Sequence, residues 1–317
     1  MIDVIIPNYN GVALLPGCLD ALRRQTRRDF YVTVVDDAST DESVALLRES
    51  YPEVRVIRMS RNSGLARAIN RAIGATHQPF VVLLNNDTEA DPRWLDELIG
   101  TLERHPEYAF AASKLRLFDR RNVLHSAGDG YHCNGVPYNR GVWELDQGQY
   151  DQDREVFGPC AGAAAYRREA LTRLAVKGQV FDEDLFMYCE DVDLNLRARL
   201  AGERTIFVPT AIVYHMVSAT GGGPLASYYV GRNTILIWFK NMPLGAMWRC
   251  FGSFVRSQLL ISRDAIRHIR GAAARARLRG QLAALLLLPR FLLKRRAVER
   301  QLQTHQFLSL LTAKGFL

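Results

Sequence analysis

The first third of the chain alternates short apolar runs with amphipathic stretches. Apolar residues dominate positions 2–6, 31–35, 54–57 and 81–84, and polar residues follow each run. Short apolar runs of this kind are typical of strands that are buried on both faces of a parallel sheet. Apolar residues at helical spacing fill the gaps, so we expect helices near residues 14–23, 41–50 and 65–75. The pattern predicts an α/β fold with a mostly parallel sheet, flanking helices and right-handed crossovers.

Polar side chains collect at the carboxyl ends of these predicted strands. In chain order the tips carry Pro7, Asn8, Tyr9 and Asn10, then Asp37, then Asn62 and Gly64, then Asn86 and Asp87. Ligands of open α/β sheets bind outside the carboxyl ends of the strands, so this edge is the expected ligand site. Asp87, in an Asn-Asn-Asp context, suits a hard divalent cation that also holds diphosphate oxygens. The alternative for Asp87 is a capping residue in a turn.

A second cluster of acids lies much later in the chain. Glu190, Asp191 and Asp193 follow the aromatic segment 186–188 and open a helical pattern that closes at Gly202. Acids in a first helical turn are partly explained by capping and by the helix dipole. Three of them after a segment that looks buried also suit a partly desolvated general base beside a cleft.

These segments form an ordered set of motifs. They are PNYNG at 7–11, VVDDAST at 34–40, RNSGLARAIN at 61–70, LLNNDTE at 83–89, FMYCEDVDLNLRARLAG at 186–202 and VYHMVSAT at 213–220. The set resembles family 2 glycosyltransferases of the GT-A fold, and most of all the rhamnosyltransferase-like bacterial members that build surface polysaccharide. The resemblance covers roughly residues 2–241. It implies a Rossmann-like GT-A catalytic domain over residues 1–241.

The resemblance implies an inverting transfer of a sugar, with rhamnose as the first candidate. The donor would be a nucleotide-diphosphate sugar, and the acceptor a hydroxyl of a lipid-linked or polysaccharide molecule. Mg²⁺ or Mn²⁺ would stabilise the departing diphosphate. A single displacement needs only one carboxylate base, whereas a retaining double displacement would need a second, nucleophilic carboxylate.

The resemblance also assigns roles to individual residues. Asp191 would be the general base, with Glu190 as the alternative neighbour, and Asp37 would bind the nucleotide base. Asp87 would hold the metal, because Asn85 and Asn86 stand where many members carry an acid. His215 would join the metal or the diphosphate, or else make a structural hydrogen bond. The donor site would be completed by Pro7, Asn8, Tyr9, Asn10, Asn62, Gly64 and Asn86. Small residues at Gly158 and 161–163 would line the acceptor side.

Residues 242–317 differ from the rest of the chain in charge. They hold 14 Lys and Arg against only Asp264 and Glu299, while the whole chain is +8. No apolar run reaches the roughly 18 residues that cross a bilayer. We therefore expect amphipathic helices that lie in an anionic membrane interface. The alternatives are a helical hairpin packed on the catalytic domain and nucleic-acid binding, which no recognition motif supports.

The cysteines bear on the compartment. Cys18, Cys133, Cys160, Cys189 and Cys250 lie far apart without CxxC spacing, which argues against a zinc site and a disulfide framework. With no recognisable signal peptide, we expect a cytoplasmic protein, peripheral on the cytoplasmic face of the inner membrane. Two other functions remain open, a nucleotidyltransferase with a similar sheet and an inactive membrane-bound scaffold. The segment 116–156 carries no assignable chemistry.

Overall fold

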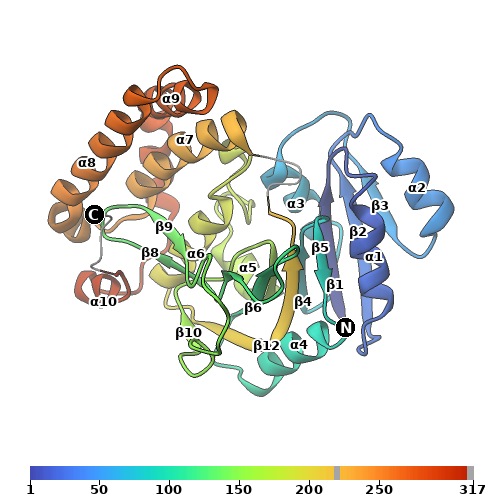
Figure 1. Ribbon diagram of the computed structural model, residues 1–317. Coiled ribbons are helices and arrows are strands. Elements are labelled where there is room, and N and C mark those ends of the chain that lie inside the picture. The colour runs from blue at the N-terminus through green and yellow to red at the C-terminus, as the bar shows by residue number, and fades with distance from the viewer. Residues whose placement is uncertain (218–221, 313–317) are drawn as a thin grey trace.

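A ten-stranded sheet forms the centre of the protein in the computed structural model, which describes residues 1–217 and 222–312 (Figure 1). Its main path runs β10-β12-β6-β11-β4-β1-β2-β3, with β5 on β12 and β7 on β6. The strands are β1 (Ile2–Asn8), β2 (Phe30–Asp36), β3 (Arg55–Arg58), β4 (Phe80–Leu84), β5 (Thr88–Ala90), β6 (Phe110–Leu117), β7 (Leu124–Ser126), β10 (Glu155–Val156), β11 (Ala163–Arg167) and β12 (Thr205–His215). The four strands expected in the first third are confirmed and run parallel, in the order β4-β1-β2-β3.

Two layers of helices cover the sheet, and the alternation of side chains along β1 explains why. Val4 and Ile6 join one core cluster with helix α1, while Ile5 joins another with helix α3, because successive side chains of a strand point to opposite faces. The helices of this part are α1 (Leu15–Arg23), α2 (Ser43–Ser50), α3 (Leu65–Ile73), α4 (Trp94–Arg104), α5 (Arg168–Leu174) and α6 (Glu190–Leu200), with the short 3₁₀ helix η1 (Glu183–Leu185) before α6. The three expected helices of the first third occur within two residues of their predicted ends.

Strand β12 lies inside the sheet, between β10 and β6, although its Pro209 is of a kind usually found on edge strands or at bulges. On one side it pairs with β6 along its length. On the other side β10 pairs with its first residues and β5 pairs with its last residues. A bulge interrupts the pairing with β6, because the register shifts between Val208 and Ile212, and Pro209 lies inside this interval. Proline cannot donate to a ladder, so it is tolerated where the regular pairing is interrupted.

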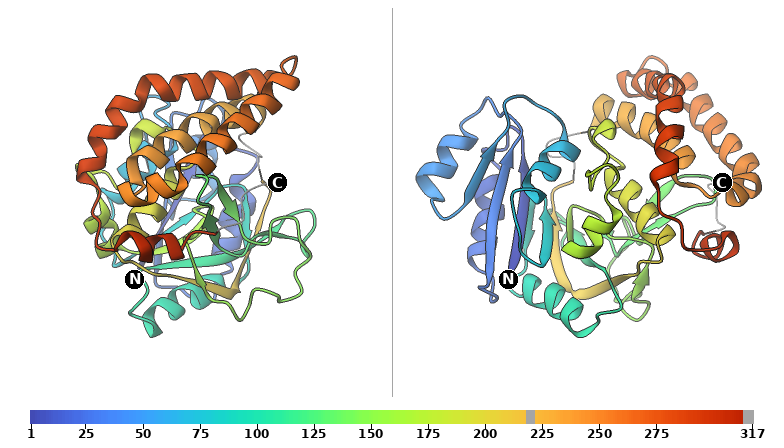
Figure 2. Two further views of the ribbon diagram at one scale, coloured as in Figure 1. Left: turned by 90° about the vertical axis from the view of Figure 1, so that its left-hand side faces the viewer. Right: turned by 180° about the vertical axis from the view of Figure 1, so that it is seen from behind.

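The helices that follow β12 pack on residues 1–215, called the catalytic half below because they make up most of the domain expected to be catalytic. They are α7 (Gly223–Asn241), α8 (Leu244–Arg267), α9 (Ala272–Lys294), η2 (Arg295–Ala297) and α10 (Thr304–Ser309). Trp238, Phe254 and Phe291 share one hydrophobic cluster with Leu196 and Leu200 of α6. Figure 2 shows α8 and α9 at the end of the molecule opposite α2 and β3. The inner faces of these helices thus match the alternative of a helical hairpin packed on the rest of the protein. None of the described helices is long and apolar enough to cross a bilayer.

Ion pairs also fasten the C-terminal helices to the catalytic half. Lys240 of α7 lies 2.7 Å from Asp182, and Arg290 of α9 lies 2.6 Å from Asp184. Lys294 bonds both of these acids. Two of the cations that make the C-terminal segment basic are therefore already neutralised within the protein.

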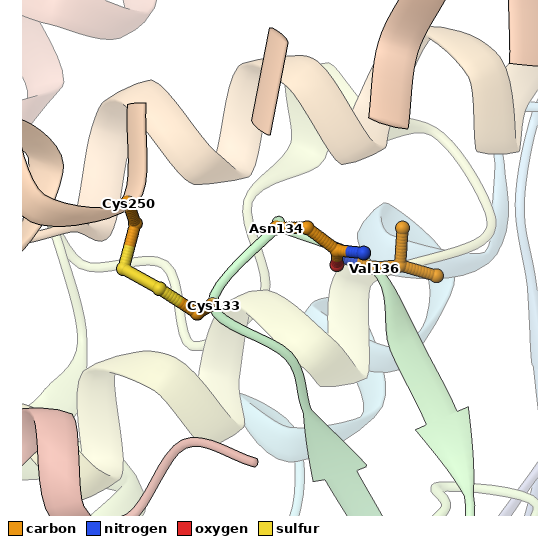
Figure 3. The surroundings of a disulfide bond; sticks show 4 residues. All are labelled: Cys133, Asn134, Val136 and Cys250. Atoms are coloured by element: carbon orange, nitrogen blue, oxygen red, sulfur yellow. A yellow bond between two sulfur atoms is a disulfide. The ribbon is translucent and has the colours of Figure 1, made fainter. Parts of the chain in front are cut away.

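The segment 116–156 contains a small hairpin, β8 (Asp129–Tyr131) and β9 (Pro137–Asn139), whose tip is covalently bound to α8. Cys133 forms a disulfide with Cys250, across a Cα–Cα distance of 5.5 Å that suits such a bond (Figure 3). The expectation of no disulfide was wrong. The two cysteines are 117 residues apart, so no spacing motif in the sequence indicates that they pair. The cysteines therefore give no support to the expected cytoplasmic location. Cys18, Cys160 and Cys189 are free.

Candidate active site

The tips of β1 and β4 are joined by a pair of buried asparagines. Nδ2 of Asn86 donates to Oδ1 of Asn8 at 2.8 Å, and Nδ2 of Asn8 donates to Asp36 at 3.1 Å. A side chain at Gly11 would lie only 2.3 Å from both asparagines, which explains the glycine that ends this motif. Asn8 and Asn86 thus shape the tip from within. Of the other residues expected here, Asn10 and Tyr9 are exposed and Pro7 is half-buried.

Asp37 organises the loop that follows β3. Its two carboxylate oxygens accept the backbone N–H groups of Ser63 and Gly64, each at 2.8 Å. Gly64 has a φ of 87°, and a Cβ there would lie 2.5 Å from the ring of Phe186, so only glycine fits. Asn62, in the same loop, is exposed. The structure therefore brings Asp37 and Gly64 together and places this loop against the segment that precedes α6.

Asp87 and His215 form the predicted metal side of the site. Oδ1 of Asp87 lies 3.1 Å from Nε2 of His215, and both side chains are buried. The β5–β12 ladder and a bond from the backbone N–H of Met216 to the carbonyl of Asp87 hold the two residues together. A carboxylate oxygen and an imidazole nitrogen at this separation are a donor set that Mn²⁺ accepts. The residues present fit the expected ion.

The ring of His125 contacts the ring of His215. The Nδ1 atoms of the two rings lie 3.1 Å apart, and the ring centroids 4.8 Å apart. Burial, together with the neighbouring His215, lowers the pKa of His125 to about 4, which keeps its imidazole neutral. Sequence reasoning missed this residue because it lies on β7, in the segment to which no chemistry was assigned. A single histidine in a Ser-Ala-Gly context gave no signal of its partner.

A turn of small residues, 160–162, lies near both His215 and Asp191. The backbone N–H of Asn85 donates to the carbonyl of Gly162 at 2.9 Å, and the N–H of Ala161 donates to Oδ2 of Asp191 at 3.2 Å. A Cβ at Gly162 would lie 3.5 Å from His215. One turn therefore contacts the tip of β4 and the acid of α6 and passes close to His215.

Asp191 and Glu190 open helix α6 and differ in protonation. Burial raises the pKa of Asp191, which makes it a stronger base than an ordinary carboxylate. Burial and the charge of Asp191 raise the pKa of Glu190 to about 8. At neutral pH the shared negative charge therefore resides on Asp191, while Glu190 holds a proton. This ordering favours Asp191 as the residue that accepts the proton of an acceptor hydroxyl.

Asp193, the third acid of the cluster, faces the interior instead. Its carboxylate bonds Lys240 at 2.8 Å, Arg197 at 3.0 Å and Asn241 at 2.8 Å. Burial alone would raise its pKa, but the charges of Lys240 and Arg197 hold it below its usual range. Asp193 is therefore a structural anion that joins α6 to α7.

Asp129 is a second acid beside Asp191 that sequence reasoning missed. Carboxylate oxygens of both acids and Sγ of Cys160 lie within 4.8 Å of one another. Asp129 accepts hydrogen bonds from Ser126 at 2.9 Å and Asn139 at 3.0 Å. Burial and the charge of Asp191 raise its pKa, so the protonated acid is favoured. A thiol beside two acids does not suit a hard cation. We therefore interpret Asp129 and Cys160 as neighbours of the Asp191 carboxylate and not as metal ligands.

The segment in front of α6 is strained and held from outside. Phe186, Tyr188 and Cys189 have positive φ angles of 66°, 63° and 62°. Non-glycine residues in this region cost free energy, and such strain persists only when neighbours over-determine it. The buried Asn233 of α7 supplies this restraint, because its Nδ2 donates to the carbonyls of Leu185, Met187 and Tyr188 at 3.0, 2.9 and 2.7 Å.

Comparisons with known proteins give the family and the fold of the chain. A family model described as glycosyl transferase family 2 matches residues 3–174. An N-acetylglucosaminyl-diphospho-decaprenol L-rhamnosyltransferase of Mycobacterium tuberculosis is 26% identical over 298 residues, which are 85% of this chain and 95% of that protein.

Solved structures show the same fold. GalNAc-T7 with UDP, GalNAc and Mn²⁺ is similar at a TM-score of 0.66 and 15% identity, over 98% of this chain and 56% of that one. The mannosyltransferase PcManGT from Pyrobaculum calidifontis, in complex with GDP-Man and Mn²⁺, is similar at a TM-score of 0.53 and 21% identity, over 94% of this chain and 73% of that one. At such identities the likeness concerns the fold, and the predicted GT-A architecture is confirmed.

Proposed function

Because the chain belongs to glycosyl transferase family 2, we propose that it moves a sugar from a nucleotide-diphosphate sugar to a hydroxyl group with inversion at the anomeric carbon. Rhamnose is the proposed sugar, since a rhamnosyltransferase is the relative that aligns over most of both chains. The observation that carries the proposal is the turn at residues 160–162. Its Ala161 N–H donates to Asp191 at 3.2 Å, and a Cβ at Gly162 would lie 3.5 Å from the ring of His215, so the turn runs from the acid of α6 to the histidine that bonds Asp87.

Asp191 is proposed to act as the general base. The acceptor hydroxyl must lose its proton as its oxygen attacks the anomeric carbon from the face opposite the diphosphate. The N–H of Ala161 holds one oxygen of Asp191 at 3.2 Å, which fixes the carboxylate for this task. Glu190 is mostly protonated at neutral pH and is the less suitable of the two neighbours.

The leaving diphosphate is proposed to meet Asp87 and His215. A divalent ion, when bound there, would supply the positive charge that offsets the charge developing on the diphosphate. The two side chains would hold the ion by one oxygen and one nitrogen, and the diphosphate would complete its ligands. Asp37 is proposed to contact the nucleotide base. Each of its oxygens accepts one backbone bond and keeps a further lone pair for a base N–H.

The acceptor is proposed to be a lipid-linked glycan at an anionic, cytoplasmic membrane surface. The name of the mycobacterial relative describes transfer to a diphospho-decaprenol, which supports a lipid carrier. The outer face of α8 supports contact with a membrane, because Trp248 is 84% exposed and Leu259 is 65% exposed. Exposed arginines 249, 256 and 263 flank these residues on the same helix. Exposed apolar side chains beside cations are typical of helices that lie in a membrane interface.

The test is turnover with a panel of nucleotide sugars that includes a rhamnose donor, with Mn²⁺ and with a chelator. The expected products are a nucleoside diphosphate and a glycoside whose anomeric configuration, read by NMR, is inverted. In a parallel incubation with nucleoside triphosphates and sugar 1-phosphates, release of pyrophosphate would instead indicate a nucleotidyltransferase. No product from any donor, from protein that binds nucleotide, would favour the inactive scaffold.

A further inference from the structure

Two imidazole rings form a chain of contacts with Asp87, in which His215 contacts Asp87 and His125 contacts His215. Nε2 of His215 lies 3.1 Å from Oδ1 of Asp87, and Nδ1 of His215 lies 3.1 Å from Nδ1 of His125. His215 ends β12 and His125 lies on β7, and both strands pair with β6. Both ring nitrogens of His215 are therefore engaged, one with the acid of the metal side and the other with a second histidine.

The short distance between the two Nδ1 atoms restricts the protons. A neutral imidazole has one N–H, and its other nitrogen is an acceptor or a metal ligand. Two facing nitrogens at 3.1 Å form a hydrogen bond only if one of them carries a proton, because two protons or two lone pairs would repel. When His215 donates from Nδ1, its Nε2 keeps a free lone pair. When His125 donates, Nε2 of His215 carries the proton and can bond Asp87.

We propose that His125 is a positioning residue that selects the metal-binding tautomer of His215, an inference that rests on the metal-assisted transfer proposed above. Nδ1 of His125 accepts the Nδ1–H of His215, which presents the bare Nε2 on the side of Asp87. Without an ion, His125 donates instead, and Nε2–H of His215 bonds Asp87.

The change between the two arrangements balances in protons. One proton moves from Nδ1 of His125 to Nδ1 of His215, Nε2 of His215 releases one to solvent, and Nε2 of His125 takes one up. Both rings remain neutral, and Asp87 is partnered in either arrangement. Hydrogen bonds of this outer kind orient metal-binding histidines, and their removal typically lowers metal affinity about 10- to 100-fold.

The experiment compares binding of Mn²⁺ alone to the full-length protein and its variants, followed by EPR. His125→Leu removes the acceptor, while His125→Asn places an amide oxygen near the position of Nδ1. We expect the affinity for Mn²⁺ to fall about 10- to 100-fold in His125→Leu and to recover in His125→Asn. The spin-echo modulation from a coordinated imidazole nitrogen should follow the same order. His105→Leu, a half-buried histidine that directly follows α4, is the matched control.

Asp87→Ala and His215→Ala are measured beside these variants, and thermal unfolding confirms that each protein is folded. If His125→Leu does not fold, His125→Phe takes its place. Loss of Mn²⁺ binding in Asp87→Ala and His215→Ala with parental binding in His125→Leu would overturn the inference and leave the metal site standing. Parental binding in all three would overturn the metal site itself, and the inference with it. Failure of His125→Asn to recover binding would also overturn the inference.

Discussion

At the scale of single residues, the two adjacent acids at the start of α6 have different tasks. We expect Asp191→Asn, which keeps the shape and the bond to Ala161 but cannot take up a proton, to lower kcat by roughly 10²- to 10⁴-fold. Binding of the nucleotide donor should change little, because the base contacts the acceptor. Steady-state kinetics and donor calorimetry provide the measurements. Near-normal turnover in Asp191→Asn with a large loss in Glu190→Gln would move the base to Glu190.

Glu190 makes stability depend on pH. Its pKa is raised to about 8 from an ordinary value of 4.5, so the folded protein binds a proton that the unfolded chain has already lost. The free energy of unfolding should therefore fall as pH rises from about 4.5 to about 8. In Glu190→Gln this part of the dependence should vanish, and the variant should gain in melting temperature over the parent at pH 8 but not at pH 4.5. Thermal unfolding across this range tests it, with the exposed Glu49→Gln as control. A parallel pH dependence in parent and Glu190→Gln would contradict the shift.

At the scale of elements, the strained segment before α6 depends on one side chain of α7. We expect Asn233→Leu to release residues 186–189, because the carbonyls of Met187 and Tyr188 lose this donor, while that of Leu185 keeps Arg232 and the N–H of Met187. A displacement of the base by about 1 Å can lower the rate on the order of 10²-fold. Each unsatisfied buried carbonyl costs about 1–3 kcal/mol of stability.

Kinetics and hydrogen exchange of the amides at 186–191 measure this effect. Gln281→Leu is the matched control, because its side chain bonds Gln258 and Ser262 within the C-terminal helices and not the strained segment. It should lose stability without faster exchange at 186–191. Unchanged exchange at this segment in Asn233→Leu would show that other contacts hold it.

At the scale of the whole molecule, the ion pairs of the C-terminal helices decide which cations can reach a membrane. Arg290 and Lys294 are paired with acids of the catalytic half, whereas Arg249, Arg256 and Arg263 are exposed on α8. We expect replacing these three α8 arginines by glutamine to weaken binding to anionic liposomes by about 10²-fold, at about 1 kcal/mol for each cation.

Liposome co-sedimentation at low and high salt measures the effect, with neutral liposomes beside anionic ones. The matched control replaces arginines 48, 58 and 71, which lie on α2, β3 and α3 toward the other end of the molecule (Figure 1). An equal loss in both triple variants would indicate general charge attraction and not a membrane face on α8. Turnover on a short soluble acceptor should persist in the α8 variant.

The sequence by itself determined the parallel part of the sheet, its first helices and the edge on which the candidate site lies. These features follow from periodicities within a few residues, because burial on one or two faces imposes a spacing that is visible locally. The acids at Asp37, Asp87 and Asp191 were found because Asp37 and Asp87 follow predicted strands and Asp191 opens a predicted helix.

Only the tertiary structure decided how residues from distant segments are used. It paired His125 with His215 across 90 residues and Cys133 with Cys250 across 117. It also brought Asp129 beside Asp191 and turned Asp193 inward to Lys240. Such pairings depend on how elements pack, and no spacing along the chain records them. The same holds for charge, because a count of cations along the C-terminal segment cannot tell a paired lysine from an exposed arginine.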